Sequence, residues 1–224
     1  MDRKAFIPPA VARYRMLQTA VPGVDALYEI VLGIARAKAS FGSRILVIGA
    51  GGGRELQMLS KIENSSFVAV DKSPEMLGYA RSIARNIGFE HRVTFVEGEV
   101  ADVKLHPESD IAIALLVLHY IESFEAKISF LKCVRERMAR GACFAIADIC
   151  VGSAQELDDL IQVFRETART ATLSDEEIEA EISALKRLPM VSERRLKELL
   201  AEAGFKRAKP FFRGLWYVGI FAET

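Results

Sequence analysis

A cluster of glycines between an apolar run and a helical pattern is the strongest chemical signal in this chain of 224 residues. The apolar run Arg44–Ile48 leads directly into Gly49, Gly51 and Gly53. Glycine lets the main chain turn tightly and approach a ligand closely, and a helix that begins there presents free N–H groups and a partial positive charge. The pattern favours a loop that binds a nucleotide or nucleoside, with a purely structural turn as the alternative.

An acidic residue at the end of the next apolar run strengthens that interpretation. Asp71 lies 20 residues after Gly51 and directly follows the strand-like segment 67–70. A carboxylate at this position accepts hydrogen bonds from ribose hydroxyls in dinucleotide-binding folds. The alternative is that Asp71 only begins the turn before the helix at Pro74. Together, the loop and the carboxylate predict a site for a ligand that contains a nucleoside.

A parallel sheet is expected to position these residues, because apolar runs alternate with helical patterns over the first two thirds of the chain. Ligands on such sheets bind at the carboxyl ends of the strands, where the strand order reverses. The expected strands are 44–48, 67–70, 93–96, 111–118 and 143–149, and the expected helices are 24–39, 54–61, 74–86 and 124–138.

The alternation stops after Val151. Helical patterns at 155–170 and 175–188 predict an inserted cap, and a further helix at 192–203 precedes two apolar runs that predict a hairpin at the sheet edge. We therefore expect one α/β domain with a Rossmann-like, doubly wound and mostly parallel sheet of about seven strands. Its parts are an N-terminal lid and helix (1–40), a cofactor-binding core (41–151), a helical cap (152–190) and a C-terminal helix with an antiparallel hairpin (191–224).

From Arg44 to Ile149 the chain resembles the class I methyltransferases that use S-adenosylmethionine (SAM). Their glycine loop reads G-x-G-x-G, whereas NAD enzymes have a glycine where this chain has Arg54. Many relatives carry an acidic residue two positions before the first glycine, and Val47 departs from that pattern. The resemblance implies SAM as the cofactor and S-adenosylhomocysteine (SAH) as its product. The cofactor-binding residues that it implies are Gly49, Ala50, Gly51, Gly53, Asp71, Lys72, Met76, Glu99, Val100 and Leu115.

Later segments carry the same resemblance. Segment 71–77 resembles the strand end that binds ribose in the family, where the following apolar residue packs on adenine. Segment 95–100 resembles the motif whose acidic residue and next backbone N–H lie near the adenine edge. Segments 110–120 and 137–144 resemble the fourth strand and the turn into the fifth.

The outer segments resemble one branch of that family, the bacterial carboxy-SAM synthases that act in wobble-uridine modification of tRNA. The segment 16–23 and the layout of the last third of the chain carry this resemblance, which implies a helical cap and a homodimer. The branch has a tyrosine where this chain has Val24, and a cap arginine near the position of Ser183. Without that guanidinium, the extra carboxylate would lose a strong bidentate contact, so ordinary SAM is the expected ligand.

His119 is the best candidate for a general base, because it ends the expected fourth strand on the rim that faces the cofactor. A histidine satisfied by backbone contacts or facing solvent is the alternative. Asp148, near the end of the fifth strand, is a second candidate for the substrate site, with structural capping as its alternative. Tyr14, Tyr120, Trp216 and Tyr217 are candidates to line an acceptor pocket, although such aromatic residues are often core or cross-strand pairs.

The amino-acid composition limits the classes of partner that the protein is expected to bind. Lys+Arg and Asp+Glu each number 30, so the formal net charge is zero, which argues against a nucleic-acid partner. No apolar segment is long enough for a membrane span, and the first residues lack the apolar region of a secretory signal. The three cysteines form no CxxC pair and indicate reduced thiols in the cytoplasm. With three histidines, of which His91 and His106 lie in loops, we expect no metal site.

The sequence therefore predicts a SAM-dependent methyltransferase that acts on a small molecule. One alternative is an enzyme that remodels SAM itself, as a carboxy-SAM synthase or a SAM-consuming cyclase does. Further alternatives are a methyltransferase that modifies tRNA and a SAM-binding subunit without activity, which the departure at Val47 motivates.

Overall fold

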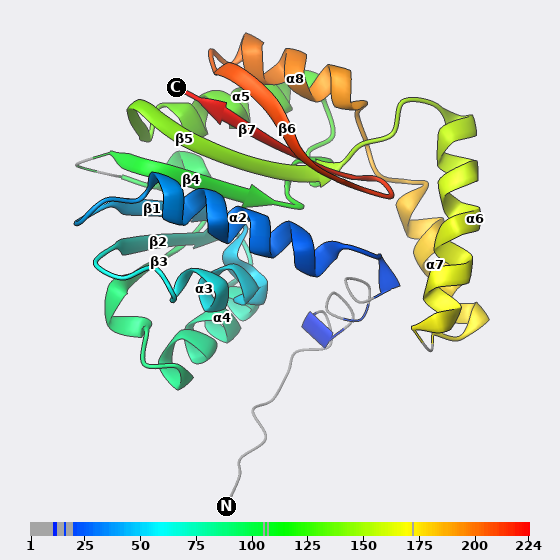
Figure 1. The fold of residues 1–224 in the computed structure, drawn as a ribbon, viewed down its shortest axis with the longest axis horizontal. Helices are drawn as coiled ribbons and strands as arrows, with labels where there is room; N and C mark the ends of the chain where they lie inside the picture. The colour runs from blue at the N-terminus through cyan, green and yellow to red at the C-terminus, as the bar shows by residue number, and fades with distance from the viewer. Residues whose placement is uncertain (1–10, 13–15, 17–19, 105, 107, 172) are drawn as a thin grey trace, which may run out of the picture.

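The computed structural model describes residues 11–12, 16, 20–104, 106, 108–171 and 173–224. In this part of the chain seven strands form one sheet in the order β3-β2-β1-β4-β5-β7-β6 (Figure 1). Neighbours from β1 to β5 pair in parallel, whereas β7 pairs antiparallel with both β5 and β6, which confirms the expected sheet and its C-terminal hairpin. The strands are β1 (Arg44–Ile48), β2 (Ser66–Asp71), β3 (Val93–Glu97), β4 (Ser109–Leu115), β5 (Met138–Ile149), β6 (Lys206–Gly214) and β7 (Tyr217–Glu223).

Most helices begin at a serine that the sequence places at the N-cap. The Ser73 hydroxyl accepts a hydrogen bond from Met76 N at 3.2 Å, and Pro74 follows at the first helical position. Serines cap α5, α6, α7 and α8 in the same way. The helices are α2 (Val24–Lys38), α3 (Arg54–Leu59), α4 (Pro74–Asn86), α5 (Phe124–Arg135), α6 (Ala154–Thr170), α7 (Asp175–Leu185) and α8 (Glu193–Glu202), and short 3₁₀ turns are η1 (Ala50–Gly52), η2 (Glu90–Arg92), η3 (Val100–Asp102) and η4 (Leu118–Tyr120).

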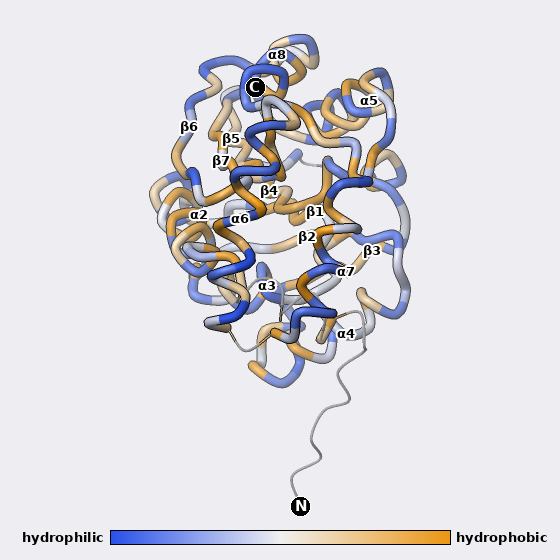
Figure 2. Tube along the Cα trace, turned by 90° about the vertical axis from the view of Figure 1, so that its right-hand side faces the viewer, coloured by the Kyte–Doolittle hydropathy of each residue, from blue (hydrophilic) through white to orange (hydrophobic). Residues whose placement is uncertain are grey.

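Both faces of the sheet are buried, which explains why the central strands are continuous apolar runs. Along β1, Ile45 and Val47 face the cluster that packs under α2, α3 and α4, whereas Leu46 and Ile48 face the cluster under α5 and α8. The central strands run through the hydrophobic interior (Figure 2). Packing against helices on both faces thus holds the strands in place and fixes where their ends lie.

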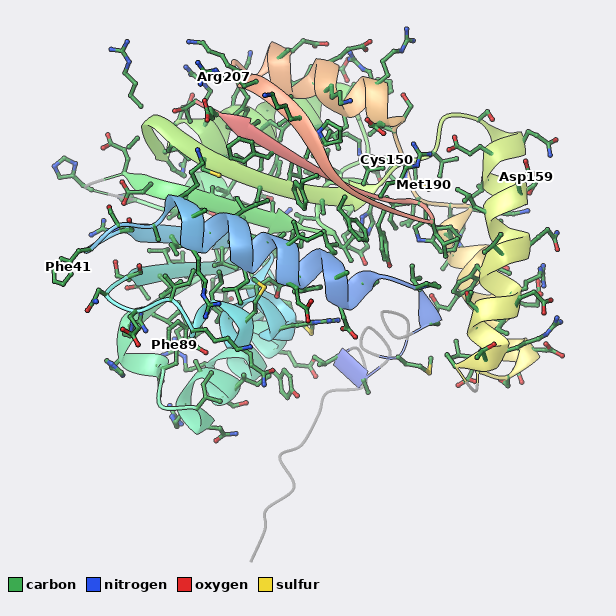
Figure 3. All side chains as sticks on the ribbon, viewed as in Figure 1. Phe41, Phe89, Cys150, Asp159, Met190 and Arg207 are labelled. Carbon is green, nitrogen blue, oxygen red and sulfur yellow. The ribbon has the colours of Figure 1, made fainter. Side chains whose placement is uncertain are left out.

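The strand order reverses between β1 and β4, so the carboxyl ends of β1, β2 and β4 define the expected ligand crevice. Helices α6 and α7 stand together beyond the carboxyl ends of the parallel strands, at the right of Figure 1. The chain enters and leaves this cap side by side, because Val151 N donates to Val191 O at 3.0 Å. Cys150 and Met190 mark this junction in Figure 3. The helical cap therefore covers the edge where the ligand site is expected.

Two strand boundaries differ from the sequence-based expectation. We expected the fourth strand to run to residue 118, but β4 ends at Leu115 because Leu116 takes a left-handed conformation with φ of 60°. We expected the fifth strand to begin at residue 143, but β5 begins at Met138, which pairs with Ser109 of β4 across a register shift. The first difference determines where His119 lies.

Candidate functional site

The glycine loop lies tightly against the end of β2. Gly51 N donates a hydrogen bond to Asp71 Oδ2 at 2.8 Å. A Cβ atom at Gly51 would lie 2.6 Å from that oxygen and 2.7 Å from Met76 Cβ, so a side chain does not fit there. Gly49 and Gly53, with φ of 72° and 66°, turn the chain into and out of η1. The structure thus brings together the loop, Asp71 and Met76 as the sequence predicts.

Asp71 is oriented by two backbone donors. Besides Gly51 N on Oδ2, Ser73 N donates to Oδ1 at 2.8 Å. A carboxylate offers about four lone-pair positions, so each oxygen keeps capacity for a further donor. Two vicinal hydroxyls of a ribose would match these two oxygens.

The remaining cofactor candidates surround this point. Gly98 N donates to Asp71 O at 3.0 Å and so fixes the segment after β3 against the end of β2. Lys72 Nζ and Glu99 Oε1 form an exposed ion pair at 2.7 Å. Three of the other candidates are buried hydrophobic positions in this region, namely Ala50, Val100 and Leu115.

His119 lies in η4, beyond the end of β4, rather than on the strand as expected. It is 5% exposed, and its Nδ1 lies 2.7 Å from Asp148 Oδ1. Asp148 also accepts from the backbone nitrogens of Leu118 at 2.6 Å, His119 at 3.2 Å and Ile149 at 2.7 Å. Asp148 is therefore occupied by donors of the protein itself, in the manner of the capping alternative.

The aromatic candidates have different environments. Tyr120 is 69% exposed, with its ring centroid 4.1 Å from that of His119. Trp216 is buried between the hairpin and the cap, where its ring packs 5.2 Å from that of Phe164 of α6. Tyr14 lies outside the described residues. Tyr120 is thus beside His119, whereas the packing of Trp216 is that of a core residue.

Sequence reasoning did not single out Lys127, which is 1% exposed on α5. Its Nζ donates to Leu118 O at 2.9 Å and also to Ile121 O, so it holds the turn that carries His119. A signal was present, because Lys127 shares the helical stripe of the buried residues Leu131 and Val134 at spacings of four and seven. A charged residue in an apolar stripe indicates a special role.

Glu55 is a second buried charged residue that sequence reasoning missed. It lies in the first turn of α3, directly after the glycine loop, and is 2% exposed. Tyr28 of α2 donates its hydroxyl to Glu55 Oε1 at 2.9 Å. Burial raises the pKa of Glu55, and the hydrogen bonds from its own backbone and from Tyr28 oppose that rise. The pair joins α2 to the helix that begins at the loop.

Glu55→Gln is expected to stabilise the protein at pH 8 and to have little effect near pH 4.5. The raised pKa means that the folded state holds the Glu55 proton more tightly than the unfolded state, so wild-type stability falls as pH rises from the unfolded value through the folded one. Glutamine still accepts the Tyr28 hydroxyl and carries no charge. Thermal unfolding of both proteins from pH 4.5 to 8 checks this, with an expected gain of a few °C at pH 8. A variant that melts below wild type at pH 8 would contradict it.

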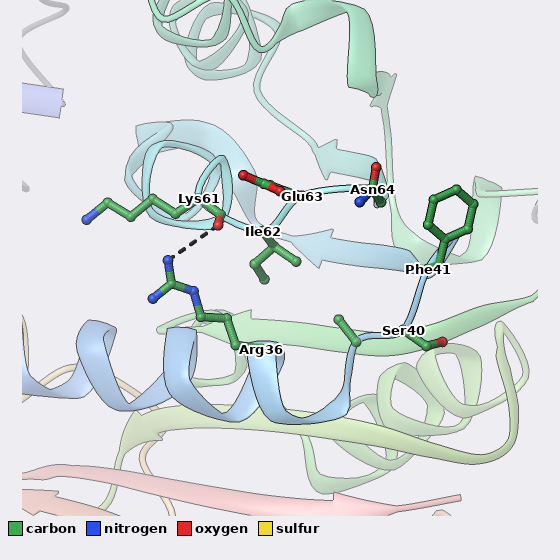
Figure 4. A pocket seen from close by; sticks show the side chains of 8 residues that line it. Arg36, Ser40, Phe41, Lys61, Ile62, Glu63 and Asn64 are labelled. Carbon is green, nitrogen blue, oxygen red and sulfur yellow. Dashed lines mark hydrogen bonds between the residues drawn. The ribbon is translucent and has the colours of Figure 1, made fainter.

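A pocket of about 330 Å³ lies at the opposite edge of the sheet, between the end of α2 and the segment that follows α3 (Figure 4). Arg36 donates to Lys61 O at 3.3 Å across it. Phe41 is 88% exposed and projects from the far end of the molecule (Figure 3). The amino ends of β1 and β2 lie here, so this pocket is remote from the glycine loop.

Much of the basic charge in segment 186–213 is neutralised by ion pairs. Arg213 pairs with Glu156 at 2.6 Å and with Glu193 at 3.3 Å, and so links the hairpin to α6 and α8. Lys186 pairs with Asp158 of α6 at 3.2 Å. Arg195, Lys197 and Arg207 also contact glutamates. Such pairing disfavours this segment as a phosphate-binding surface.

Comparisons with known proteins agree with this geometry. The family model described as a methyltransferase domain matches residues 40–204. The carboxy-S-adenosyl-L-methionine synthase of Chromohalobacter salexigens is 24% identical over 215 residues, which span 92% of this chain and 78% of that protein.

Two solved structures share the fold. Magnesium protoporphyrin IX methyltransferase from Synechocystis PCC 6803, with bound SAH, has a TM-score of 0.67 and 15% identity, over 96% of this chain and 94% of that one. An O-methyltransferase family 2 protein from Planctomyces limnophilus DSM 3776, in complex with apigenin, has a TM-score of 0.67 and 17% identity. The match spans 99% of this chain but only 63% of that protein.

Proposed function

The chain belongs to the methyltransferase domain family, and from this premise we propose that this SAM-dependent enzyme of class I fold methylates a small-molecule acceptor. The cap supports this acceptor class, because α6 and α7 stand beyond the carboxyl ends of the parallel strands (Figure 1). We expect this cap to enclose the site when ligands are bound, and an enclosed site suits a small ligand better than a macromolecule. The structural relative that binds apigenin adds support.

The residues present fit SAM at the switch point. We propose that Asp71 binds the ribose hydroxyls and that the glycine loop, with Gly49, Gly51 and Gly53, lies against the rest of the cofactor. Gly51 cannot carry a side chain, and both Asp71 oxygens keep capacity for a donor. We propose that Met76 packs on the adenine, as the resemblance to the family implies. When bound, SAM supplies an activated methyl group, so the protein mainly has to align the acceptor with it.

A transfer assay tests the acceptor class. The protein is incubated with SAM that carries a CD₃ group and with a panel of small alcohols, phenols, amines, thiols and carboxylic acids. We expect mass spectrometry to find one class of acceptor that gains the labelled methyl group while SAH accumulates. Label transfer to tRNA, with none to any small molecule, would contradict the proposal.

A second candidate is an enzyme that remodels SAM, favoured by the carboxy-SAM synthase relative. Two positions argue against it. Val24 is buried where that branch has a tyrosine, and Ser183, near the position of the branch's cap arginine, lies exposed on α7. Carboxylated SAM bound to the purified protein would establish this candidate instead.

The cellular location and the oligomeric state of the protein stay predictions. Within the described ranges no helix has the length and apolar character needed to cross a membrane. We propose a cytoplasmic protein with a single SAM-binding domain that pairs as a homodimer, as the resemblance to carboxy-SAM synthases implies.

A further inference from the structure

The turn that carries His119 requires a backbone conformation that leucine disfavours. Leu116 has φ of 60°, a region where its Cβ crowds the following carbonyl. Its backbone N–H is held by Ala147 O at 2.8 Å, so the chain leaves β4 sharply and enters η4. Strain of this kind persists where the surrounding structure imposes it, and it is often found at functional sites.

Asp148 holds the turn from the side of β5. It is 2% exposed, and both of its oxygens accept hydrogen bonds from N–H groups of the protein. The contact with His119 Nδ1 at 2.7 Å completes this set when Nδ1 carries the ring proton. A hydrogen bond at one ring nitrogen decides the tautomer of a neutral histidine. In the neutral ring with its proton on Nδ1, Nε2 of His119 keeps its lone pair.

Lys127 holds the same turn from the side of α5. Its ammonium donates to Leu118 O and Ile121 O, the carbonyls on either side of His119 and Tyr120. Burial lowers the pKa of Lys127, and the charge of Asp148 opposes that decrease. Asp148 and Lys127, two buried groups of opposite charge, thus both form hydrogen bonds to one short turn. A buried charge is tolerated only when it is paired and hydrogen-bonded.

Nε2 of His119 makes no hydrogen bond to the described residues. Nδ1 makes the ring's one hydrogen bond to the described residues. In the same part of the chain, no fully enclosed side-chain nitrogen or oxygen lacks a partner. Nε2 is therefore not fully enclosed, although the residue as a whole is only 5% exposed. A fixed ring with one basic nitrogen that is left without a partner in the described residues is the arrangement that a general base requires.

We propose that Asp148 and Lys127 are positioning residues that hold His119 as the general base for a hydroxyl acceptor, which would make this enzyme an O-methyltransferase. This inference rests on the proposed function. A thiolate or carboxylate acceptor is already a nucleophile and needs no base. An amine would enter as a cation and would need a carboxylate to bind it. The carboxylate beside His119, that of Asp148, already accepts hydrogen bonds from the protein itself. A neutral hydroxyl is the class that needs Nε2.

His119 Nε2 takes the proton of the hydroxyl while its oxygen attacks the methyl carbon of SAM. The bond between that carbon and sulfur breaks, and its electron pair stays on sulfur, which gives neutral SAH. The acceptor leaves as a methyl ether, and the imidazolium then returns its proton to water.

Nitrogen NMR of histidine tests the positioning without any cofactor or acceptor. The double variant H91Q/H106Q leaves His119 as the one histidine of the chain. We expect the ¹⁵N shifts and couplings at neutral pH to show the proton on Nδ1. Adding Asp148→Asn should move it wholly or partly to Nε2. A proton on Nε2 before that change, or an unchanged tautomer after it, would overturn the proposal, whether or not the protein binds SAM.

Kinetics with an acceptor from the CD₃ assay test the catalytic consequence. We expect His119→Asn to lower kcat by roughly 100-fold or more, with little change in KM for SAM. Asp148→Asn should cause a loss of the same order, and the double variant should be no slower than His119→Asn, because the two residues act as a unit. Lys127→Met, assayed at a temperature where it is folded, should also lower kcat more than KM.

Three kinetic results would overturn the proposal. They are multiplicative losses in the double variant, a Lys127→Met variant with wild-type kcat, and conversion confined to amines, thiols or carboxylic acids.

Discussion

Replacing Asp71 by alanine is expected to lower the affinity for SAM by roughly 100-fold or more. The carboxylate is held by Gly51 N and Ser73 N with both oxygens able to accept another donor. Hydrogen bonds to a charged group contribute about 1.5–3 kcal/mol each, and every 1.4 kcal/mol is about tenfold in affinity. Losing two contacts to ribose hydroxyls therefore weakens binding by at least two decades. Isothermal titration calorimetry with SAM and SAH measures the change.

Asp110→Ala is the matched control. Asp110 is exposed at the opposite end of the sheet, where its Oδ2 accepts from Arg44 N at 2.9 Å. We expect this variant to bind SAM like wild type. A folded Asp71→Ala variant with unchanged affinity would contradict the placement of the ribose.

Replacing Lys127 by methionine is expected to destabilise the protein by roughly 3 kcal/mol. The change removes a buried ammonium, leaves Leu118 O and Ile121 O without this donor, and deprives Asp148 of a nearby positive charge. For a chain of this size the melting temperature should fall by about 6–12 °C. Thermal and urea-induced unfolding, followed by circular dichroism, measure the loss.

Lys132→Met on the same helix is the comparison for this prediction. Lys132 is exposed, so its replacement should change the free energy of unfolding by no more than about 0.5 kcal/mol. If the two variants melt together, Lys127 does not hold the turn.

The elements around the proposed cofactor site could be predicted because their signals are local. The strand 44–48 and the helix 74–86 agree with the structure residue for residue. The strand is an apolar run stopped by glycine, and the helix carries its own cap, Ser73, and a proline at its first position. Asp71 and Gly51 were likewise predicted from spacing, and a hydrogen bond joins them.

The turn around His119 could not be predicted, because its causes are not local. The apolar run continues through residue 118, so nothing in the sequence indicates that Leu116 turns the chain out of the sheet. Asp148 follows His119 by 29 residues and reaches it only because β4 and β5 are neighbours. The pairing of these two side chains is a property of the sheet rather than of either segment.

Lys127 and Glu55 illustrate a limit of reading charged residues from sequence. A lysine or glutamate on an amphipathic helix is normally exposed, and only the position within the apolar stripe distinguishes a buried one. Glu55 is buried against an element distant in the sequence, as its bond with Tyr28 shows, whereas Lys127 contacts the turn that precedes its own helix. Their partners are Tyr28 of α2 for Glu55 and the carbonyl oxygens of Leu118 and Ile121 for Lys127. These contacts form only when α2 and η4 pack in the folded protein.

The most direct test of SAM use is to identify and titrate the ligand of the purified protein. We expect mass spectrometry of the released ligand to find SAM or SAH, and calorimetry to show saturable binding of both to wild type and much weaker binding to Asp71→Ala. A protein that releases neither compound and binds neither in titration would contradict SAM as the cofactor, and only the α/β fold would remain.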